Sequence, residues 1–322
     1  MARALVDLGI ELPIYQAGMG GGLARHELAA AVSEAGGFGT IGFLPASELA
    51  DELARARERT SAPVAVNLLL PFARAEHWRV ASEADAVITF WGAPRRHTSG
   101  VWLHQAGSVA EARAAHAAGA DAVIVQGVEA GGHVRASRPA LELLAEVTRA
   151  LPAGFPALLA GGISTSDDVR TAIDAGAAGV VVGTRFLMTE ESAAHPAYKR
   201  ALVAAKETVL TELFGLGWPA QHRVIRNEAT ERWLRGDRRG PSAVRRLHRV
   251  TAPVLARLPE SVQESTVRLQ HPAVPLFGPL APTVDRAEEL VRSGPLYSGE
   301  SVKRINDIRT ADEVTRALAA GL

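Results

Sequence analysis

A histidine that follows two glycines is the residue best placed for proton chemistry in this chain. Gly131-Gly132-His133 comes soon after an apolar run at residues 122–125, whose length and β-branched content are typical of a buried parallel strand. Paired glycines let the backbone approach a flat or anionic group. A histidine beside such a group can transfer protons near neutral pH. Taken alone, the motif more often marks a tight turn, so its interpretation depends on the rest of the chain.

Two further glycine clusters indicate a phosphate site. Gly161-Gly162 ends an apolar run at residues 155–160, and Gly183-Thr184 ends another at residues 179–184. In α/β barrels the loops after the seventh and eighth strands often bind phosphate through backbone N–H groups and a helix N-terminus. The alternative is that these glycines only let a helix pack closely on a strand. Two such loops side by side favour the phosphate site.

Two amide side chains in apolar surroundings suggest what carries the phosphate. Asn67 lies within the run at residues 63–70, and Gln126 directly follows the run at 122–125. Each can offer a donor and an acceptor to the edge of a heteroaromatic ring. Together with a phosphate site they favour FMN over a sugar phosphate. No Gly-x-Gly-x-x-Gly opens a βαβ unit, so no Rossmann dinucleotide site is predicted.

The other nine histidines are weaker candidates. His97 falls in a short loop and His104 within an apolar run, so either could reach a site, whereas the remaining seven show no partner pattern. No spacing of His, Asp or Glu resembles a metal site, and none is predicted. The chain contains no cysteine, which excludes thiolate catalysis, thiolate metal ligands and disulfides.

Eight short apolar runs separated by helical patterns predict the fold. They lie at residues 13–17, 38–44, 63–70, 86–90, 101–105, 122–125, 155–160 and 179–184. None forms a hairpin with the next, so the order predicts an α/β TIM (β/α)8 barrel with ligands at the carboxyl ends of the strands. Ser47 is the expected N-cap of the helix after the second strand. The stretch at 92–100 is too short and polar for a full crossover helix, so we expect a stunted or missing helix there.

The character of the chain changes after Leu187. Residues 195–270 show helical patterns and no convincing strand. We expect an FMN-binding barrel at residues 1–195, an inserted helical subdomain after the eighth strand at residues 196–270 that covers the substrate, and a C-terminal return to the barrel at residues 271–322. Further helices are expected at 283–292 and from Thr310. The arginine-rich stretch at 223–249 is either a solvated helical surface, the commoner case, or a phosphate-binding face.

The composition is that of an ordinary soluble enzyme. Hydrophobic residues make up 47% of the 322 residues and charged residues 22%. The formal net charge is zero, which argues against a nucleic acid or an anionic membrane as partner. The N-terminus has no signal-peptide pattern, and no apolar run approaches ~18 residues. A cytoplasmic protein without a membrane partner is therefore expected.

Several strings of residues together resemble one family. They are Gln126-Gly-Val-Glu-Ala-Gly-Gly-His133, Ala160-Gly-Gly-Ile163, Val182-Gly-Thr-Arg-Phe186, Val66-Asn-Leu68 and Leu296-Tyr-Ser-Gly299. Through nearly its whole length the chain resembles the class I nitronate monooxygenases, formerly called 2-nitropropane dioxygenases. FMN-dependent enoyl-acyl-carrier-protein reductases carry a string similar to the first of these, which keeps a second activity open.

The resemblance implies one non-covalent FMN in the barrel. The residues that it implies as cofactor contacts are Gly18, Met19, Asn67, Gln126, Gly131, Gly132, Gly161, Gly162, Val181, Val182, Gly183, Thr184, Tyr297, Ser298 and Gly299. It also implies that His133 acts beside the flavin, as base for a neutral nitroalkane or as partner of an anionic nitronate. The implied reaction is flavin-mediated oxidation of an alkyl nitronate, such as propionate 3-nitronate, by O2 to a carbonyl compound and nitrite, as in detoxification. The expected partners are a small-molecule substrate and O2, with a homodimer considered as the assembly.

Three departures from the family pattern concern the substrate side. The family usually has proline where this chain has Gly18, and residues 134–136 read Val-Arg-Ala where many members have Arg-Gly. The connection between the fourth and fifth strands is also short. An NAD(P)H-dependent FMN reductase of an enoyl thioester or a quinone therefore stays open as an alternative. A flavin-binding protein without turnover is a third reading, and it would not need His133.

Overall fold

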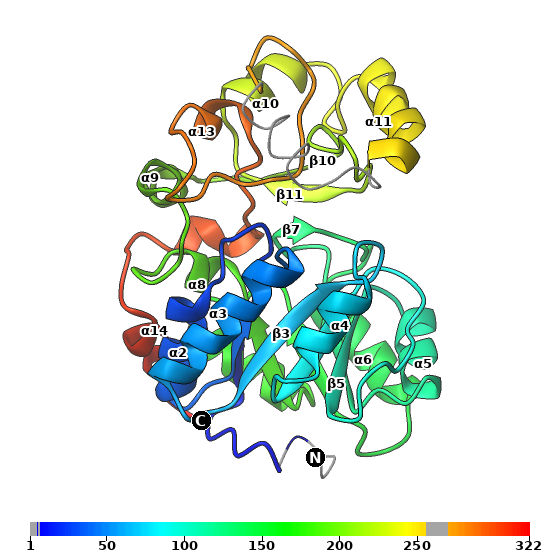
Figure 1. Cartoon of the computed structure of the whole chain (residues 1–322), viewed down its shortest axis with the longest axis vertical. Coiled ribbons are helices and arrows are strands. Elements are labelled where there is room, and N and C mark those ends of the chain that lie inside the picture. Colours follow the sequence, from blue (N-terminus) through cyan, green and yellow to red (C-terminus); the bar gives the residue numbers. More distant parts are fainter. Residues whose placement is uncertain (1–4, 6, 256–269) are drawn as a thin grey trace. The chain divides into compact units, whose positions relative to one another are not determined.

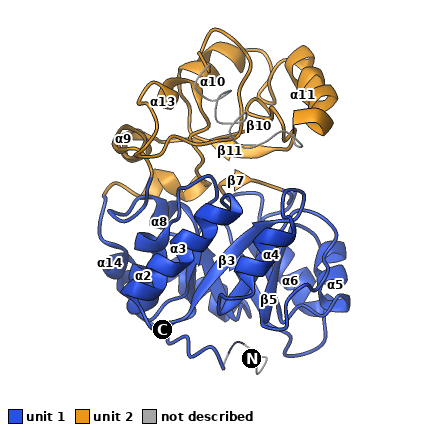
Figure 2. Ribbon diagram, in the orientation of Figure 1, with its two compact units in different colours: residues 1–130, 135–193, 308–322 blue, residues 131–134, 194–307 orange. Residues whose placement is uncertain are grey.

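The computed structural model describes Leu5, residues 7–255 and residues 270–322, and the chain forms two compact units. The barrel unit comprises residues 1–130, 135–193 and 308–322, and the second unit comprises residues 131–134 and 194–307 (Figure 2). Residues 256–269 of the expected insert lie outside the described residues, as do residues 1–4 and 6 of the expected barrel.

Eight parallel strands form the sheet of the barrel unit. They are β1 (Ile14–Gln16), β2 (Gly39–Ile41), β3 (Val64–Leu69), β4 (Ala86–Phe90), β5 (Val101–Ala106), β6 (Ala122–Gln126), β8 (Ala157–Ala160) and β9 (Gly179–Val182). Their order is β1-β9-β8-β6-β5-β4-β3-β2. A parallel bridge between Tyr15 and Phe38 joins the two edges of this sheet. The predicted TIM barrel is confirmed, and each of the eight expected strands is present.

Helices follow most of the strands. They are α2 (His26–Glu34), α3 (Ala46–Arg59), α4 (Ala75–Ala81), α5 (Val109–Ala117), α6 (Ala140–Ala150), α7 (Ser166–Asp174), α8 (Thr184–Leu187) and α14 (Ala311–Ala319). Within this unit, α2, α3 and α4 lie outside the strands (Figure 1). The prediction of Ser47 as an N-cap is wrong, because α3 begins at Ala46. Its N-cap is Pro45, whose fixed φ suits the turn into a helix but which makes no side-chain cap bond.

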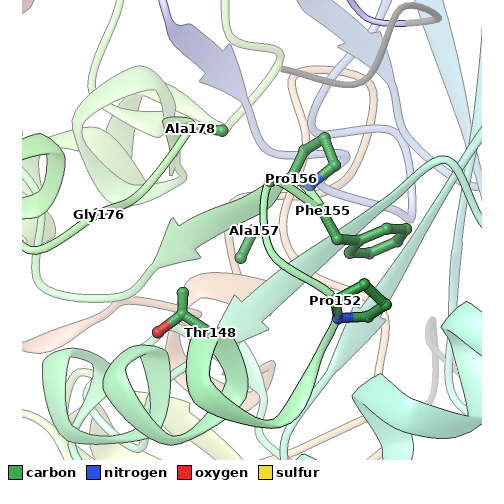
Figure 3. A pocket seen from close by; sticks show the side chains of 8 residues that line it. Thr148, Pro152, Phe155, Pro156, Ala157, Gly176 and Ala178 are labelled. Carbon is green, nitrogen blue, oxygen red and sulfur yellow. The ribbon is translucent and has the colours of Figure 1, made fainter.

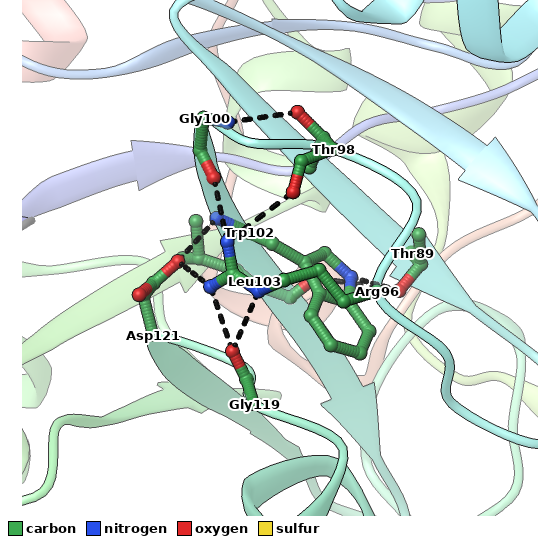
Figure 4. Close-up of polar contacts among 8 residues, drawn as sticks. All are labelled: Thr89, Arg96, Thr98, Gly100, Trp102, Leu103, Gly119 and Asp121. Atoms are coloured by element: carbon green, nitrogen blue, oxygen red, sulfur yellow. Dashed lines mark hydrogen bonds and ion pairs between the residues drawn. The ribbon is translucent and has the colours of Figure 1, made fainter.

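No helix lies between β4 and β5, as expected, and Arg96 fastens the extended connection that replaces it (Figure 4). Arg96 Nη2 donates to the Gly119 carbonyl at 2.7 Å and to Asp121 Oδ2 at 2.6 Å. Its guanidinium lies 5.8 Å from the centre of the Trp102 ring. Charge-assisted bonds of this kind are stronger than neutral ones. Arg96 therefore links the connection between β4 and β5 to the segment that leads into β6.

The alternation of side chains along the strands decides which residues share a face. Ala65, Leu103 and Ile124 belong to one buried core cluster together with residues of the other strands. Since successive strand residues point to opposite faces, Asn67 and Gln126 lie on the same face as this cluster. His104 neighbours Leu103 and lies on the opposite face.

The second unit contains a three-stranded sheet, whereas we expected helices alone. The strands β10 (Val209–Thr211), β11 (His222–Val224) and β7 (Gly132–His133) are antiparallel, in the order β10-β11-β7. Two- and three-residue strands are too short to give a recognisable period. The other elements described are α9 (Pro196–Ala204), α10 (Glu228–Trp233), α11 (Ser242–Leu255), α13 (Leu290–Ser293) and the 3-10 helix η1 (Glu300–Arg304).

The expected helix at 283–292 is wrong except at its end, where α13 begins at Leu290. Thr283 Oγ1 donates to Asp285 Oδ1 at 2.6 Å, and Arg286 N donates to the Thr283 carbonyl at 3.0 Å. Short polar side chains stabilise turns by such local bonds and compete with helix formation.

Residues 271–307 belong to the second unit, so the chain returns to the barrel unit at Ile308 rather than at His271. Asn227 Nδ2 holds this segment in place by donating to the carbonyls of Val291 at 3.0 Å and Gly294 at 2.8 Å.

Among the helices formed by described residues, none is long and apolar enough to cross a membrane.

Candidate functional site

Two amide side chains point to the inner face of the barrel unit and are held in fixed orientations. Asn67 is buried on β3, and its Nδ2 donates to the Ile88 carbonyl at 3.3 Å. Gln126 is the last residue of β6, and its Oε1 accepts from the backbone N–H of Arg135 at 3.0 Å. The carboxyl ends of β3 and β6 are where ligands of this fold bind. Both amides are thus oriented before any ligand arrives.

In this chain Gly18 packs closely against Asn67. A Cβ atom at residue 18 would overlap Asn67 Cβ and lie 2.8 Å from Asn67 Cγ. Any side chain there would displace the Asn67 amide. The Gly18-Met19 turn follows β1, and Met19 N donates to the Ala17 carbonyl at 2.9 Å.

The two glycine loops after β8 and β9 have the backbone expected of a phosphate cradle. Gly161 has φ +119° and Gly162 has φ +78°, values that favour glycine. A Cβ at Gly183 would meet only Ala17 Cβ, at 3.7 Å, so the space beside it is open. Thr184 follows as the first residue of α8, and α7 starts four residues after Gly162. These loops belong to neighbouring strands.

Glu129, inside the motif that ends in His133, has a structural role. Its two carboxylate oxygens accept from Ala140 N at 2.9 and 3.1 Å, at the first residue of α6. A carboxylate at that position satisfies a free N–H and complements the helix dipole. The acidic residue of the motif therefore stabilises the start of α6.

His133 lies on β7 in the second unit, within a group of aromatic rings. Its imidazole stacks on Trp218 with ring centres 3.6 Å apart and planes 16° apart. The His222 ring lies 5.3 Å away and the Tyr297 ring 5.5 Å away. These rings come from three segments that are far apart in the sequence. We call them the His133 ring cluster.

The ring cluster favours a neutral His133. Burial lowers the pKa of His133 well below its usual value, and proximity to His222 lowers it further. Burial also lowers the pKa of His222 to about 4. His222 Nε2 accepts from Phe214 N at 3.2 Å, so its Nδ1 carries the proton shared with the Ala220 carbonyl at 3.0 Å. Hence His222 is a neutral structural group, whereas His133 is the candidate for chemistry.

Gly131 fits beneath the loop that ends in Gly299. A Cβ at residue 131 would lie 2.5 Å from Gly299 N and 2.6 Å from the Ser298 carbonyl carbon. Gly132 has φ +71°, which favours glycine for a different reason. Tyr297 OH donates to the Pro279 carbonyl at 2.7 Å, and Ser298 N donates to the Arg223 carbonyl at 3.1 Å. The Leu296-Tyr-Ser-Gly299 string thus lies against the Gly-Gly-His string.

The two other candidate histidines lie elsewhere. His97 is exposed, and its ring centre lies 4.5 Å from that of Trp78 with the planes tilted by 33°. His104 is buried on the face of β5 opposite the core cluster, and Thr89 Oγ1 lies 2.8 Å from its Nδ1. Burial lowers the pKa of His104 to about 4.

One histidine and carboxylate group in the described part of the chain has ligand atoms within 4.8 Å of one another: His26, Glu27 and Glu52. Glu52 Oε2 accepts from both the backbone N of His26, at 2.8 Å, and its Nδ1, at 2.7 Å. Hydrogen bonding at the start of α2 accounts for this arrangement without a metal.

A pocket of about 300 Å³ lies at the amino ends of β8 and β9 (Figure 3). It is lined by Thr148, Pro152, Gly154, Phe155, Pro156, Ala157, Gly176 and Ala178. None of these residues titrates, and the amino face of a TIM barrel serves stability. The pocket is therefore unrelated to the loops described above.

The predicted site residues form one group in each unit. Those in the barrel unit are Gly18, Met19, Asn67, Gln126, Gly161, Gly162, Val181, Val182, Gly183 and Thr184. Those in the second unit are Gly131, Gly132, His133, Tyr297, Ser298 and Gly299. Trp218 was not among the predicted residues, although an aromatic residue within Gly215-Leu-Gly-Trp-Pro219 is a recognisable exception in a turn-rich stretch.

Comparison with known proteins identifies the family. A family model described as nitronate monooxygenase matches residues 3–94 and 80–320. The chain belongs to the nitronate monooxygenase family. It is a flavin-dependent oxidoreductase, like the members of that family.

Curated relatives carry two kinds of name. A nitronate monooxygenase of Pseudomonas aeruginosa is 34% identical over 262 residues, which cover 63% of this chain and 74% of the relative. A (3aS,4S,5R,7aS)-5-hydroxy-7a-methyl-1-oxo-octahydro-1H-indene-4-carboxyl-CoA dehydrogenase of Mycobacterium tuberculosis is 36% identical over 244 residues, covering 72% of this chain and 68% of the relative.

Solved structures with a similar fold support the assignment to this family. FabK from Thermotoga maritima aligns with a TM-score of 0.76 and 28% identity, covering 99% of this chain and 95% of that one. A nitroalkane oxidase from Streptomyces ansochromogenes aligns with a TM-score of 0.75 and 28% identity, covering 98% and 97%.

The residues of the barrel unit fit a flavin mononucleotide. The open space beside Gly183 and the positive φ angles of Gly161 and Gly162 let a phosphate approach the backbone. The oriented amides of Asn67 and Gln126 suit the polar edge of a ring.

Proposed function

We propose that this member of the nitronate monooxygenase family uses FMN to oxidise alkyl nitronates, such as propionate 3-nitronate, with O2 to a carbonyl compound and nitrite. The observation that carries the proposal is the His133 ring cluster, in which segments 131–133, 218–222 and 297–299 surround one histidine. A protein that only stored flavin would not need a desolvated histidine of this kind.

A neutral His133 defines what the residue can do. Because burial and His222 lower its pKa, the imidazole is unprotonated near neutral pH and can accept a proton from the α-carbon of a neutral nitroalkane. Attraction of a cationic histidine to the anionic nitronate, the other role considered from the sequence, has less support. With a preformed nitronate, neutral His133 would contribute a hydrogen bond rather than a charge.

The remaining residues would bind and orient. The loops at Gly161-Gly162 and Gly183-Thr184 would hold the phosphate, and Asn67 and Gln126 would hold the ring edge in the orientations already set by Ile88 and Arg135. The FMN supplies the redox step when bound. Trp218 would exclude water from one face of the His133 ring.

A second candidate is flavin-dependent dehydrogenation of a coenzyme A thioester. The name of the Mycobacterium tuberculosis relative favours it. Dehydrogenation next to a thioester also begins with loss of an α-proton, which suits a neutral histidine. The second unit carries 18 lysine and arginine residues against 12 aspartate and glutamate residues, a balance that suits a phosphate-bearing substrate.

The test compares the two substrates on one preparation. Heat-released cofactor is identified by mass, and the holoenzyme is mixed with propionate 3-nitronate in air while O2 uptake and nitrite are followed. We expect both signals, and no bleaching of the flavin by NADPH alone. Anaerobic bleaching by an acyl-CoA without nitrite formation from nitronate would support the second candidate and reject the first. Rapid bleaching by NADPH would instead favour a reductase.

A further inference from the structure

Trp91 has an unusual backbone conformation at the end of β4. Its φ of +65° is the only positive value for a non-glycine residue in the described part of the chain. Gly92 follows with φ +128°. A bulky residue in the left-handed region is a true outlier, and such strain gathers at ligand-binding positions, where surrounding structure enforces it.

The Trp91 ring is held by groups from two other parts of the barrel unit. The Arg135 guanidinium carbon lies 4.8 Å from the centre of the Trp91 ring. Arg135 Nε donates to Glu111 Oε1 at 2.7 Å, and its Nη2 bonds to the same oxygen. Glu111 is itself fixed, because its Oε2 accepts from Gly107 N at 2.7 Å. We call Trp91, Arg135 and Glu111 the rim clamp.

Gly107 lets the Arg135 backbone pack closely against the end of β5. A Cβ at Gly107 would lie 2.7 Å from Arg135 Cβ and 2.7 Å from Ala136 N. The Arg135 backbone can therefore cross the end of β5 only because residue 107 has no side chain. Phe90 packs edge-on against the Trp91 ring at 5.4 Å.

The rim clamp adjoins the predicted flavin contacts within the barrel unit. Arg135 N donates to Gln126 Oε1 at 3.0 Å. The clamp thus spans the carboxyl ends of β4, β5 and β6, which are neighbours in the sheet. That edge is where this fold binds ligands, and Arg135 links the Trp91 ring to Gln126, since its guanidinium lies over the indole and its backbone N–H bonds to the amide.

We propose that Trp91 is a specificity-determining residue, whose indole forms a rigid wall that admits small, unbranched nitro compounds and excludes bulky ones. Arg135 and Glu111 are positioning residues, since they hold the ring in place. The inference rests on the proposed function for its substrate class. The backbone strain at Trp91 and the contacts of its ring do not depend on the proposed function.

Two substitutions distinguish the effect of the Trp91 ring on substrate size from the effect of its backbone strain on stability. Trp91→Ala removes the ring but keeps a Cβ in the left-handed region, whereas Trp91→Gly removes both. Binding of nitroethane and of nitrocyclohexane to each holoenzyme is measured from the change in flavin absorption, which needs no turnover. We expect the wild-type preference for nitroethane to fall about tenfold or more in both variants, a size typical of pocket shape. Trp91→Gly should unfold at a higher urea concentration than Trp91→Ala.

If both variants keep the wild-type preference for nitroethane, Trp91 does not determine substrate size. If Trp91→Ala is more stable than Trp91→Gly, the backbone of residue 91 is not strained, and the argument for the wall loses its basis. Trp91→Phe keeps an aromatic ring over Arg135, so it should restore most of the preference even if the smaller variants fold poorly. Wild-type protein that binds both nitro compounds as expected but releases no nitrite would reject the proposed function and leave the wall standing.

Discussion

The two units present their site residues in different ways. The barrel unit offers backbone, in the form of glycines with positive φ and amides fixed by carbonyl and N–H groups. The second unit offers rings, packed around a histidine whose pKa they lower. Backbone cradles depend on the absence of side chains, and ring clusters depend on their presence. The first kind of group is therefore suited to holding a cofactor, and the second to controlling a proton.

We expect the largest effect from removing the His133 imidazole, which tests this contrast between the two units. In His133→Asn we expect turnover of a neutral nitroalkane to fall about 10²- to 10⁴-fold, the range typical of a general base. The flavin content should stay at the wild-type level, because His133 is not among the predicted cofactor contacts and the loops proposed to hold the phosphate are in the barrel unit. Initial rates of O2 uptake and the absorbance ratio of flavin to protein measure the two effects.

His97→Asn is the matched control for that variant. His97 is exposed on the connection between β4 and β5 and contacts Trp78, so its replacement should leave turnover within about twofold. A similar loss in both variants, or loss of flavin in His133→Asn, would contradict the division of roles between the units.

The barrel unit was largely predictable because its signals are local. Each strand is a short apolar run, and glycines mark the turns at the ends of β8 and β9. The period of two also places Asn67 and Gln126 inside once their strands are recognised. What could not be predicted is how those amides are oriented, because the partners at Ile88 and Arg135 belong to other segments.

The second unit was poorly predictable for the opposite reason. Its sheet joins two residues of β7 to three of β11, which lies almost ninety residues later in the chain. Neither strand shows a period, and the stacking of His133 on Trp218 depends on this pairing. Nor could the sequence reveal that Trp91 has positive φ, since a bulky residue is the last to be expected there.

The next prediction concerns the backbone cradle. Gly162 and Gly176 both have positive φ, at +78° and +95°, so alanine at either position costs about 1–2 kcal/mol of backbone strain. Only Gly162 lies in a loop predicted to hold phosphate. Titration of the apoprotein with FMN should show about tenfold to hundredfold weaker binding for Gly162→Ala. Gly176→Ala should lose stability without losing affinity, and equal affinity losses would refute the cradle.

Acid should destabilise both units through buried histidines. His104 in the barrel unit and His222 in the second unit each have a pKa lowered to about 4 by burial. The unfolded chain binds these protons with a pKa near 6.5, so their stabilising contribution is complete above that pH and is lost as pH falls toward about 4. From pH 7 to pH 5 each group should cost about 2 kcal/mol.

Urea unfolding at the two pH values measures this acid effect. His104→Gln should reduce the difference between them, because glutamine can still bond to Thr89 but does not titrate. His222→Gln should do the same for the second unit. If the units unfold separately, each substitution will alter the pH dependence of only one transition. An unaltered pH dependence in both variants would show that other groups cause the acid sensitivity.

The smallest expected effect tests the ring cluster itself. Trp218 covers one face of the His133 ring at 3.6 Å, so replacing it with phenylalanine lets in some water and raises the pKa of His133 toward its usual value. The acidic limb of the profile of kcat/KM against pH should then move to higher pH, lowering the rate at pH 6 about threefold while leaving the rate at pH 8 nearly unchanged. Trp233→Phe is the control, since that indole donates to the Pro272 carbonyl elsewhere in the same unit. A uniform loss at all pH values would mean that Trp218 only supports the fold, and the contrast between a backbone cradle and a ring-controlled proton would then rest on His133 alone.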